Sequence, residues 1–225
     1  MANSNISATE TTLRDSVRLL GDLLGQVIRE QVGEDCYELE EELRLAAKAR
    51  RSGDDAEALS EQLRARAKDF AQQPQQALQV LKAFELYFQL INLAEEQHRV
   101  GVLRQRSRQA HTQQQALKDS LEEAIAELHR QGLDAEAMQD LLNQVMITPV
   151  FTAHPTEAKR RVVQKKLRSI AKALQRYQDG NLFPAEQARL HRWLHELISA
   201  LWQTHETRTN KPTVDDEVEQ GLYFL

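Results

Sequence analysis

The sequence of 225 residues has one cysteine and is poor in glycine, proline and aromatic residues. The single Cys36 excludes an internal disulfide and a cysteine-cluster metal site. With only 8 glycines, 5 prolines and 5% aromatic residues, the composition argues against an all-β or low-complexity chain. Hydrophobic residues make up 41% and charged residues 28%, as in soluble globular proteins. We therefore expect a mainly helical protein of one or two domains.

The chain also lacks an excess of positive charge and any long apolar run. Lys and Arg number 29 against 34 Asp and Glu, and this net charge of -5 gives no global attraction to nucleic acid or anionic lipid. No stretch approaches the roughly 20 apolar residues of a membrane span. The first residues carry no basic-then-apolar signal sequence. We expect no nucleic-acid partner, no membrane association and a cytoplasmic location.

Apolar residues recur at steps of three and four along the first hundred residues, which is the spacing of amphipathic helices. One helix is predicted from Leu13 to Val27, with Gly33 as its C-cap. Two more are predicted through Leu39 to Ala46 and through Leu59 to Phe70. A fourth opens at Pro74 and runs to about residue 98. Its predicted core stripe is Ala77, Leu81, Phe84, Phe88 and Ile91.

The polar stretch 99–112 is rich in Arg and Gln and is predicted to hold a loop. A fifth helix is predicted to stop at Gly132, and Asp134 can cap a short sixth helix. The fifth helix packs through four apolar residues, which are Leu117, Leu121, Ala124 and Leu128.

The helical pattern breaks at Val145. Residues 145–153, Val-Met-Ile-Thr-Pro-Val-Phe-Thr-Ala, are β-rich and predict one short buried strand, in which Pro149 suggests an edge or a bulge. Two long helices are predicted after it, one starting near Pro155 and one after Pro184. Their buried stripes are Val163, Leu167, Ile170 and Leu174 in the first, and Leu190, Leu194, Leu197 and Leu201 in the second.

Near the end of the chain, Thr213 and Asp216 form the T-x-x-D pattern of a capping box that begins another helix. Val218, Leu222 and Leu225 lie on one face of that helix and lack a partner in the pattern. We expect a truncated chain whose missing part supplies the remaining strands. A natural helical terminus docked on the body is the alternative.

The segment Thr152-Ala153-His154-Pro155-Thr156-Glu157 places a histidine between the predicted strand and a helix N-terminus. The loops after barrel strands are where α/β barrels place catalytic groups, and free N–H groups at a helix start can hold an anion. The positive end of the helix dipole also favours the neutral imidazole, which can accept a proton. A buried imidazole bonded to the backbone is the structural alternative for His154.

Eight Lys or Arg residues and no acidic residue lie between Ala158 and Gln178. Cations in the first turns oppose the helix dipole unless an anion is bound there, and Arg suits bidentate contact with phosphate or carboxylate. Arg160 lies three residues before Val163 and is predicted to continue the inward stripe. Arg161 is predicted to face solvent. A solvated basic helix paired with acids elsewhere is the alternative.

Other polar groups give weaker signals. His191 and His195 are four residues apart and could chelate a metal with His205, but they lack the glutamate of H-E-x-x-H. We interpret them as surface or packing histidines and expect no metal site in this chain. Trp193 and Trp202 are predicted to be core residues. Arg208 could reach an anion or pair with Glu206.

Phe-Thr-Ala-His-Pro-Thr-Glu at 151–157, followed by Arg160-Arg161, resembles the first histidine motif of phosphoenolpyruvate carboxylases. The Leu-Gly-x-x-Leu-Gly pattern at 20–25 and Asn-Leu-Ala-Glu-Glu-Gln-His at 92–98 are similar to two further segments of that family. Residues 201–213 are similar to the segment before the family's next helix, although His205 stands where related sequences often have Asp. The resemblance covers essentially the whole chain, in order.

The resemblance implies a longer, largely helical protein around one parallel β/α barrel, with the motif at the first barrel strand. Residues 1–144 are then the helical N-terminal region, and residues 145–225 begin the barrel region with one strand at 145–153 and long helices. The remainder of the polypeptide supplies the rest of the barrel, and the full-length protein is expected to be an allosteric homotetramer.

The implied activity is carboxylation of phosphoenolpyruvate by bicarbonate to oxaloacetate and phosphate, an anaplerotic CO₂ fixation that feeds the tricarboxylic acid cycle. Bicarbonate takes the phosphoryl group, and CO₂ from the resulting carboxyphosphate meets the enolate. His154 matches the motif histidine that accepts the proton releasing CO₂, and Arg160 and Arg161 are candidate anion-binding residues. The Mg²⁺ or Mn²⁺ ligands are expected in later sequence, so this chain alone is expected to be inactive. A non-enzymatic helical module whose basic helix binds an acidic partner is the alternative function.

Overall fold

The computed structural model describes residues 2–52, 56–148, 160–180, 182–205 and 213–224. The mainly helical fold predicted from composition is confirmed, because these residues form nine α-helices and no strand. None of the helices described is long and apolar enough to cross a membrane. The helices are α1 (Ala2–Gln31), α2 (Glu34–Ser52), α3 (Ala56–Gln72), α4 (Pro74–Thr112), α5 (Leu121–Arg130), α6 (Ala135–Gln144), α7 (Arg161–Gln178), α8 (Pro184–Trp202) and α9 (Val214–Phe224).

The chain divides into two compact units. Residues 1–98 and 159–208 form the first unit, and residues 99–158 and 209–225 form the second. α4 runs through the boundary, with its first 25 residues in the first unit. The sequence analysis instead predicts a domain boundary after residue 144, where the barrel region is expected to begin. That boundary stays a prediction.

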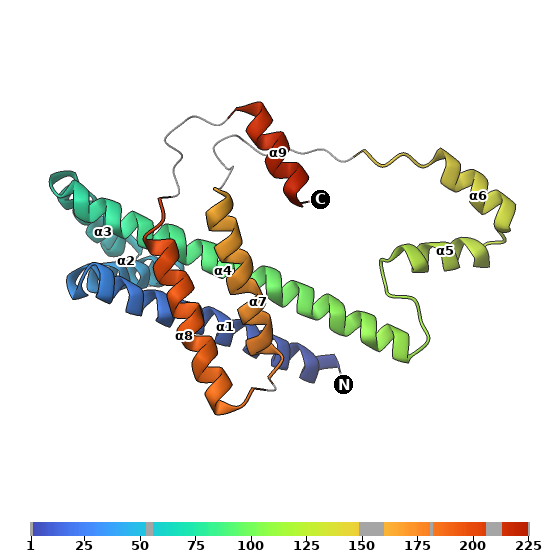
Figure 1. The fold of residues 1–225 in the computed structure, drawn as a ribbon, viewed down its shortest axis with the longest axis horizontal. Helices are drawn as coiled ribbons and strands as arrows, with labels where there is room; N and C mark the ends of the chain where they lie inside the picture. The colour runs from blue at the N-terminus through green and yellow to red at the C-terminus, as the bar shows by residue number, and fades with distance from the viewer. Residues whose placement is uncertain (1, 53–55, 149–159, 181, 206–212, 225) are drawn as a thin grey trace. The chain divides into compact units, whose positions relative to one another are not determined.

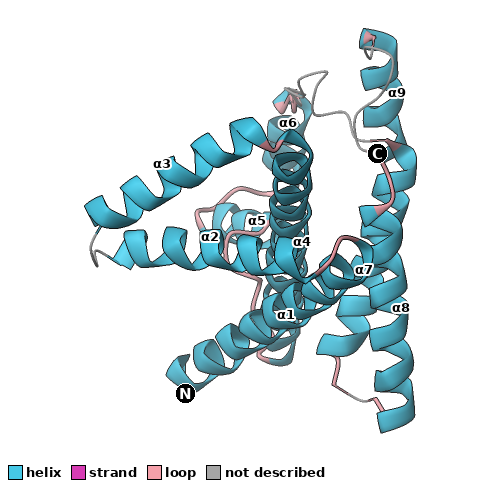
Figure 2. Cartoon of the chain, turned by 90° about the vertical axis from the view of Figure 1, so that its left-hand side faces the viewer, coloured by secondary structure: helices cyan, strands magenta, loops and turns pink. Residues whose placement is uncertain are grey.

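In the first unit, α1 contacts α2, α7 and α8 (Figure 1). α2 and α3 run side by side as a second helical pair (Figure 2). Apolar side chains of α1, α4, α7 and α8 fill the core. Full burial of one such side chain stabilises the fold by about 1.5–3 kcal/mol. The largest fully buried ones are Leu20, Ile28, Leu86, Leu90, Ile170, Leu174, Leu194, Ile198 and Leu201.

The turn between α1 and α2 confirms the predicted glycine stop. Gly33 has φ +122°, a left-handed conformation that glycine adopts without strain. The N–H groups of Val32 and Gly33 both donate to the Ile28 carbonyl, at 2.9 and 3.2 Å. Farther back in α1, Gly25 allows close approach of Tyr37, since a Cβ there would lie 2.8 Å from Tyr37 Cε2. The glycine thus lets α2 pack against α1.

Two predictions about α4 are wrong. The stretch 99–112 is helix and not a loop, because Arg, Gln and Ala are good helix formers and the single Gly101 does not break the run. The predicted stripe also has the wrong phase: Leu81 is 65% exposed and Phe88 58% exposed, and Phe84 packs only at the core's edge. The buried stripe is instead Val80, Ala83, Leu86, Leu90, Leu93 and Ala94.

In the second unit three helix starts are capped by side chains, and the sequence predicted two of these caps, Asp134 and Thr213. Ser120 Oγ accepts from the Glu123 N–H, so α5 begins later than Leu117. Asp134 Oδ1 accepts from the Ala137 N–H at 2.9 Å and caps α6. The Thr213–Asp216 capping box is also confirmed, with Thr213 N–H donating to Asp216 Oδ2 at 2.8 Å and Asp216 N–H to Thr213 Oγ1 at 3.3 Å. Local side-chain chemistry sets these three helix starts.

The barrel strand predicted at 145–153 is not confirmed. Residues 145–148 are described and belong to neither helix nor strand, and residues 149–153 lie outside the described residues. Val145, Met146 and Ile147 are exposed. The described part of this apolar run is therefore exposed and not the buried strand that the sequence predicts.

Candidate functional site

His154 and the rest of its motif, together with Lys159, lie outside the described residues. The structure describes the site from Arg160 onward, at the point where α7 begins. It also describes the C-terminal end of α8 as far as His205. α7 and α8 run side by side in the first unit, and these two helix ends meet there (Figure 1).

Arg160 is the residue before α7, with an extended backbone of φ -61° and ψ 140°. Its side chain is exposed, and Nη1 donates to the His205 carbonyl at 3.0 Å. The prediction that Arg160 continues the inward stripe is wrong, because the helical phase starts only at Arg161. Arg161 is the first helical residue and is exposed, as predicted.

The predicted buried stripe of α7 is confirmed by Val163, Ile170 and Leu174, with Leu167 partly buried. Lys166 lies at the edge of this stripe and is half-buried. Its Nζ donates to the Ala200 carbonyl and to Thr204 Oγ1, both at 2.8 Å. Thr204 Oγ1 in turn donates to the Ala200 carbonyl at 2.6 Å. The lysine thus satisfies groups at the end of α8, where helical carbonyls lack intrahelical partners.

Sequence reasoning missed Lys166 and Thr204. The signal was present in the pattern, since Lys166 lies three residues after Val163 and four before Ile170 on a helix that buries both. A lysine at the edge of a buried stripe needs acceptors for its ammonium group. Here the acceptors come from another helix, which the sequence of α7 alone could not identify.

The geometry allows an anion to bind at Arg160. A guanidinium carries five N–H donors in a planar fork, so one bond to a carbonyl leaves capacity for phosphate or carboxylate. The His205 carbonyl holds one edge of the fork in place. His205 therefore takes part through its backbone, so the Asp-to-His difference from related sequences does not remove this contact. Glu206, Arg208 and Lys211 lie outside the described residues.

His191 and His195 on α8 lie beside side chains of two neighbouring helices. The His191 ring lies 5.9 Å from the Tyr177 ring. His195 Nε2 lies 3.1 Å from Glu30 Oε2, an ion-pair distance without hydrogen-bond alignment. Within the described ranges no group of three His, Cys, Asp or Glu side chains could hold a metal ion.

Trp202 is buried as predicted, with Lys82 Nζ 5.3 Å from its ring. Trp193 is 48% exposed, so the core prediction is wrong for it, because α8 buries Leu190, Leu194 and Leu197 instead.

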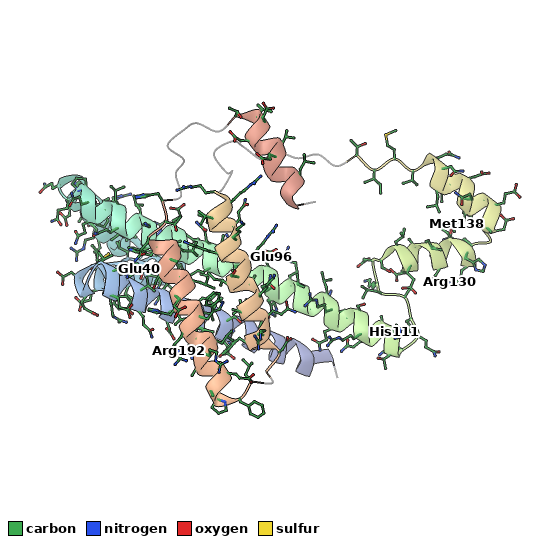
Figure 3. The ribbon with its side chains drawn as sticks, in the orientation of Figure 1. Glu40, Glu96, His111, Arg130, Met138 and Arg192 are labelled. Carbon is green, nitrogen blue, oxygen red and sulfur yellow. The ribbon has the colours of Figure 1, made fainter. Side chains whose placement is uncertain are left out.

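A second polar site lies between α1, α2 and α4, around a cavity of about 850 Å³. Arg44 binds Glu41 in a bidentate pair at 2.7 and 2.7 Å, and this hydrogen bonding lowers the pKa of Glu41. Neighbouring Glu40 on α2, labelled in Figure 3, is 5% exposed. Burial, together with the charge of Glu41, raises the pKa of Glu40 to about 7. None of the predicted site residues lines this cavity.

Comparison with known proteins identifies the family. The phosphoenolpyruvate carboxylase family model matches residues 13–225. The curated phosphoenolpyruvate carboxylase of Roseiflexus castenholzii is 44% identical over 214 residues, which are 95% of this chain and 22% of that protein. The Rhodothermus marinus enzyme of the same name is 39% identical and the Thermus thermophilus one 38%, each over 213 residues and 95% of this chain, and over 22% and 23% of the relatives. This chain therefore spans about a fifth of the length of these relatives, and it belongs to the phosphoenolpyruvate carboxylase family.

Proposed function

We propose that this chain is the N-terminal part of an enzyme that carboxylates phosphoenolpyruvate with bicarbonate to give oxaloacetate and phosphate. The observation that carries the proposal is the family match over residues 13–225, within which Thr-Ala-His-Pro-Thr-Glu is followed by Arg160-Arg161. The activity belongs to the longer polypeptide, since the chain covers about a fifth of its relatives. A barrel that begins with a strand at 145–153, a cytoplasmic homotetramer and an anaplerotic role are parts of the same proposal.

Within this enzyme, His154 accepts the proton that leaves the carboxyl group of carboxyphosphate as CO₂ is released. Neutral imidazole suits this role at physiological pH. Arg160 binds the phosphate or carboxylate of the reactants, with its guanidinium oriented by the His205 carbonyl at 3.0 Å. Arg161 at the first position of α7 adds positive charge beside it.

The resemblance also implies a Mg²⁺ or Mn²⁺ ion, which would polarise the phosphoryl and enolate oxygens. The described residues of this chain do not fit it, because they offer no cluster of three metal-ligating side chains. We derive no step through the metal and propose that its ligands belong to the further length of the relatives.

A second function, an interaction module whose basic helix binds an acidic partner, is less well supported. Two of the cations that suggested it are engaged inside the chain: Lys166 binds the end of α8, and Arg160 binds His205. The basic composition of α7 is thus partly explained by contacts between helices.

The test is a carboxylation assay on the complete polypeptide that carries this sequence. Oxaloacetate formation should require phosphoenolpyruvate, bicarbonate and divalent metal together. His154→Asn should lower kcat by about 10²–10⁴-fold, the contribution typical of a general base, while phosphoenolpyruvate binding measured by calorimetry stays unchanged. His191→Asn, on the packing face of α8, is the matched control and should retain turnover. Equal kcat in the wild type and His154→Asn would contradict the role of His154.

A further inference from the structure

We propose that Lys166 is a positioning residue for Arg160, acting through the C-terminal end of α8. This inference rests on the proposed function, because it assigns to Lys166 the task of fixing an anion-binding group of that reaction. Neither the histidine motif nor the family match singles out this residue.

The first step is the contact itself. Lys166 Nζ bridges the Ala200 carbonyl and Thr204 Oγ1, both at 2.8 Å, and Thr204 Oγ1 bonds the same carbonyl at 2.6 Å. These three groups form a closed triangle at the end of α8. Half-burial of Lys166 strengthens its charge-assisted bonds relative to an exposed lysine.

The second step runs along the backbone. Thr204 directly precedes His205, whose carbonyl accepts from Arg160 Nη1 at 3.0 Å. The Thr204 N–H also donates to the Leu201 carbonyl at 2.9 Å, so a tight turn with a bond between residues three apart follows α8. Lys166 holds the residue next to the acceptor of Arg160. Arg160 directly precedes α7, and Lys166 lies in the second turn of this helix.

The third step is the consequence of losing the ammonium. Without Lys166 Nζ, the Thr204 hydroxyl keeps its bond to the Ala200 carbonyl, but the segment at 204–205 loses the bond that joins Thr204 to α7. Arg160 is exposed, and within the described residues its guanidinium is bound by the His205 carbonyl. If the His205 carbonyl moves, the Arg160 guanidinium is less ordered before binding. It then loses more conformational entropy when an anion binds, and its affinity for the anion falls. Binding is therefore affected more than turnover.

The test uses the complete enzyme and three variants: Lys166→Met, Arg160→Ala and the double variant. Lys166→Met keeps the length of the side chain and removes its charge. It should raise the KM for phosphoenolpyruvate about tenfold, in line with the loss of hydrogen bonds to a charged group, with kcat changed less than threefold. If Lys166 acts through Arg160, the double variant should have the KM of Arg160→Ala alone.

Two further measurements keep the result unambiguous. Lys172→Met removes an exposed lysine from the same helix and should leave KM unchanged. Amide hydrogen exchange should become faster at 203–205 in Lys166→Met and not in Lys172→Met, and this readout does not depend on activity. If Lys166→Met does not fold, Thr204→Val removes one acceptor and should raise KM about threefold, again without adding to Arg160→Ala.

The inference is overturned if Lys166→Met lowers the melting temperature and leaves KM unchanged, which would make the contact structural only. Additive KM effects in the double variant, or unchanged exchange at 203–205, would overturn it as well. Failure of the proposed function looks different, since the wild-type enzyme itself would then form no oxaloacetate.

Discussion

At the scale of single residues, Arg160 and Arg161 are neighbours with different surroundings. Arg160 directly precedes α7 and its guanidinium is oriented by a bond to the His205 carbonyl, whereas Arg161 is the first residue of α7 and is exposed. A guanidinium ordered in advance loses less conformational entropy when it binds an anion. We expect Arg160→Ala in the complete enzyme to raise the KM for phosphoenolpyruvate at least tenfold, and Arg161→Ala to raise it less. Steady-state kinetics on the two variants would measure this, and the reverse order would contradict the assignment.

Glu40 gives a prediction that does not depend on activity. Its neighbour Glu41 accepts from Nε and Nη2 of Arg44, so Glu40 is buried without a full counter-charge. Burial raises its pKa from 4.5 to about 7. The folded state therefore holds this proton to higher pH than the unfolded state does. The free energy of unfolding from this group is fully present below pH 4.5 and is lost as the pH rises through 7.

We expect Glu40→Gln to remove that loss. Between pH 5 and pH 8 the wild type should lose up to about 3 kcal/mol relative to Glu40→Gln, the order of magnitude that such a pKa shift implies. Urea denaturation of both proteins at the two pH values measures it. Glu38→Gln, an exposed change on the same helix, is the control and should follow the wild type. Parallel stability curves for wild type and Glu40→Gln would show that Glu40 is not buried as described.

At the scale of elements, α4 carries two apolar stripes, of which only one is buried in the core. Leu90 is 2% exposed and belongs to the core, whereas Leu81 is 65% exposed. Leu90→Ala should lower the free energy of unfolding by about 2–5 kcal/mol, because it removes buried methyl groups and leaves a cavity. Leu81→Ala should change it by less than about 0.5 kcal/mol in the isolated chain, as for an ordinary surface substitution. Chemical denaturation separates them, and a larger effect of Leu81→Ala would restore the phase predicted from sequence.

The sequence predicted those elements whose signals are local. The glycine stop at Gly33, the caps at Asp134 and Thr213, and the stripes of α7 and α8 depend on residues within one or two turns, and all are confirmed. The phase of α4 and the exposure of Trp193 were missed because both helices carry apolar residues on more than one face. Only packing against other helices decides which face is buried.

In the candidate site, too, the sequence predicts local patterns and misses contacts between distant residues. The motif around His154 is a local pattern, so the sequence finds it, and its role stays a prediction. The clamp formed by Lys166 with Ala200 and Thr204 joins residues 34 and 38 positions apart. No periodicity within α7 can name a partner at that distance. The inward position predicted for Arg160 was wrong for a related reason. The prediction extended the helical spacing of α7 back to Arg160, but the helix begins only at Arg161.

At the scale of the molecule, several apolar side chains of the second unit are exposed. Met146 is 86% exposed and Ile147 85%, and Val218 and Leu222 on α9 are exposed as well. Monomeric proteins seldom leave such residues uncovered in contiguous runs. Relatives of this chain are between four and five times as long, since it covers 22–23% of them. We expect the additional length of the complete polypeptide to cover these side chains, as the proposed barrel requires.

This leads to a prediction for the 225-residue chain produced alone. It should be strongly helical by circular dichroism, because the core of the first unit lies within it. It should also bind a hydrophobic dye or self-associate through its exposed apolar residues. Phosphate release with phosphoenolpyruvate, bicarbonate and Mg²⁺ should stay at background, since one histidine and two arginines cannot supply the metal's charge stabilisation. Substituting Met146 and Ile147 by Ser should reduce dye binding without loss of helix, because both side chains are exposed. A monodisperse monomer with carboxylase turnover would contradict both the missing cover and the division of the site along a longer polypeptide.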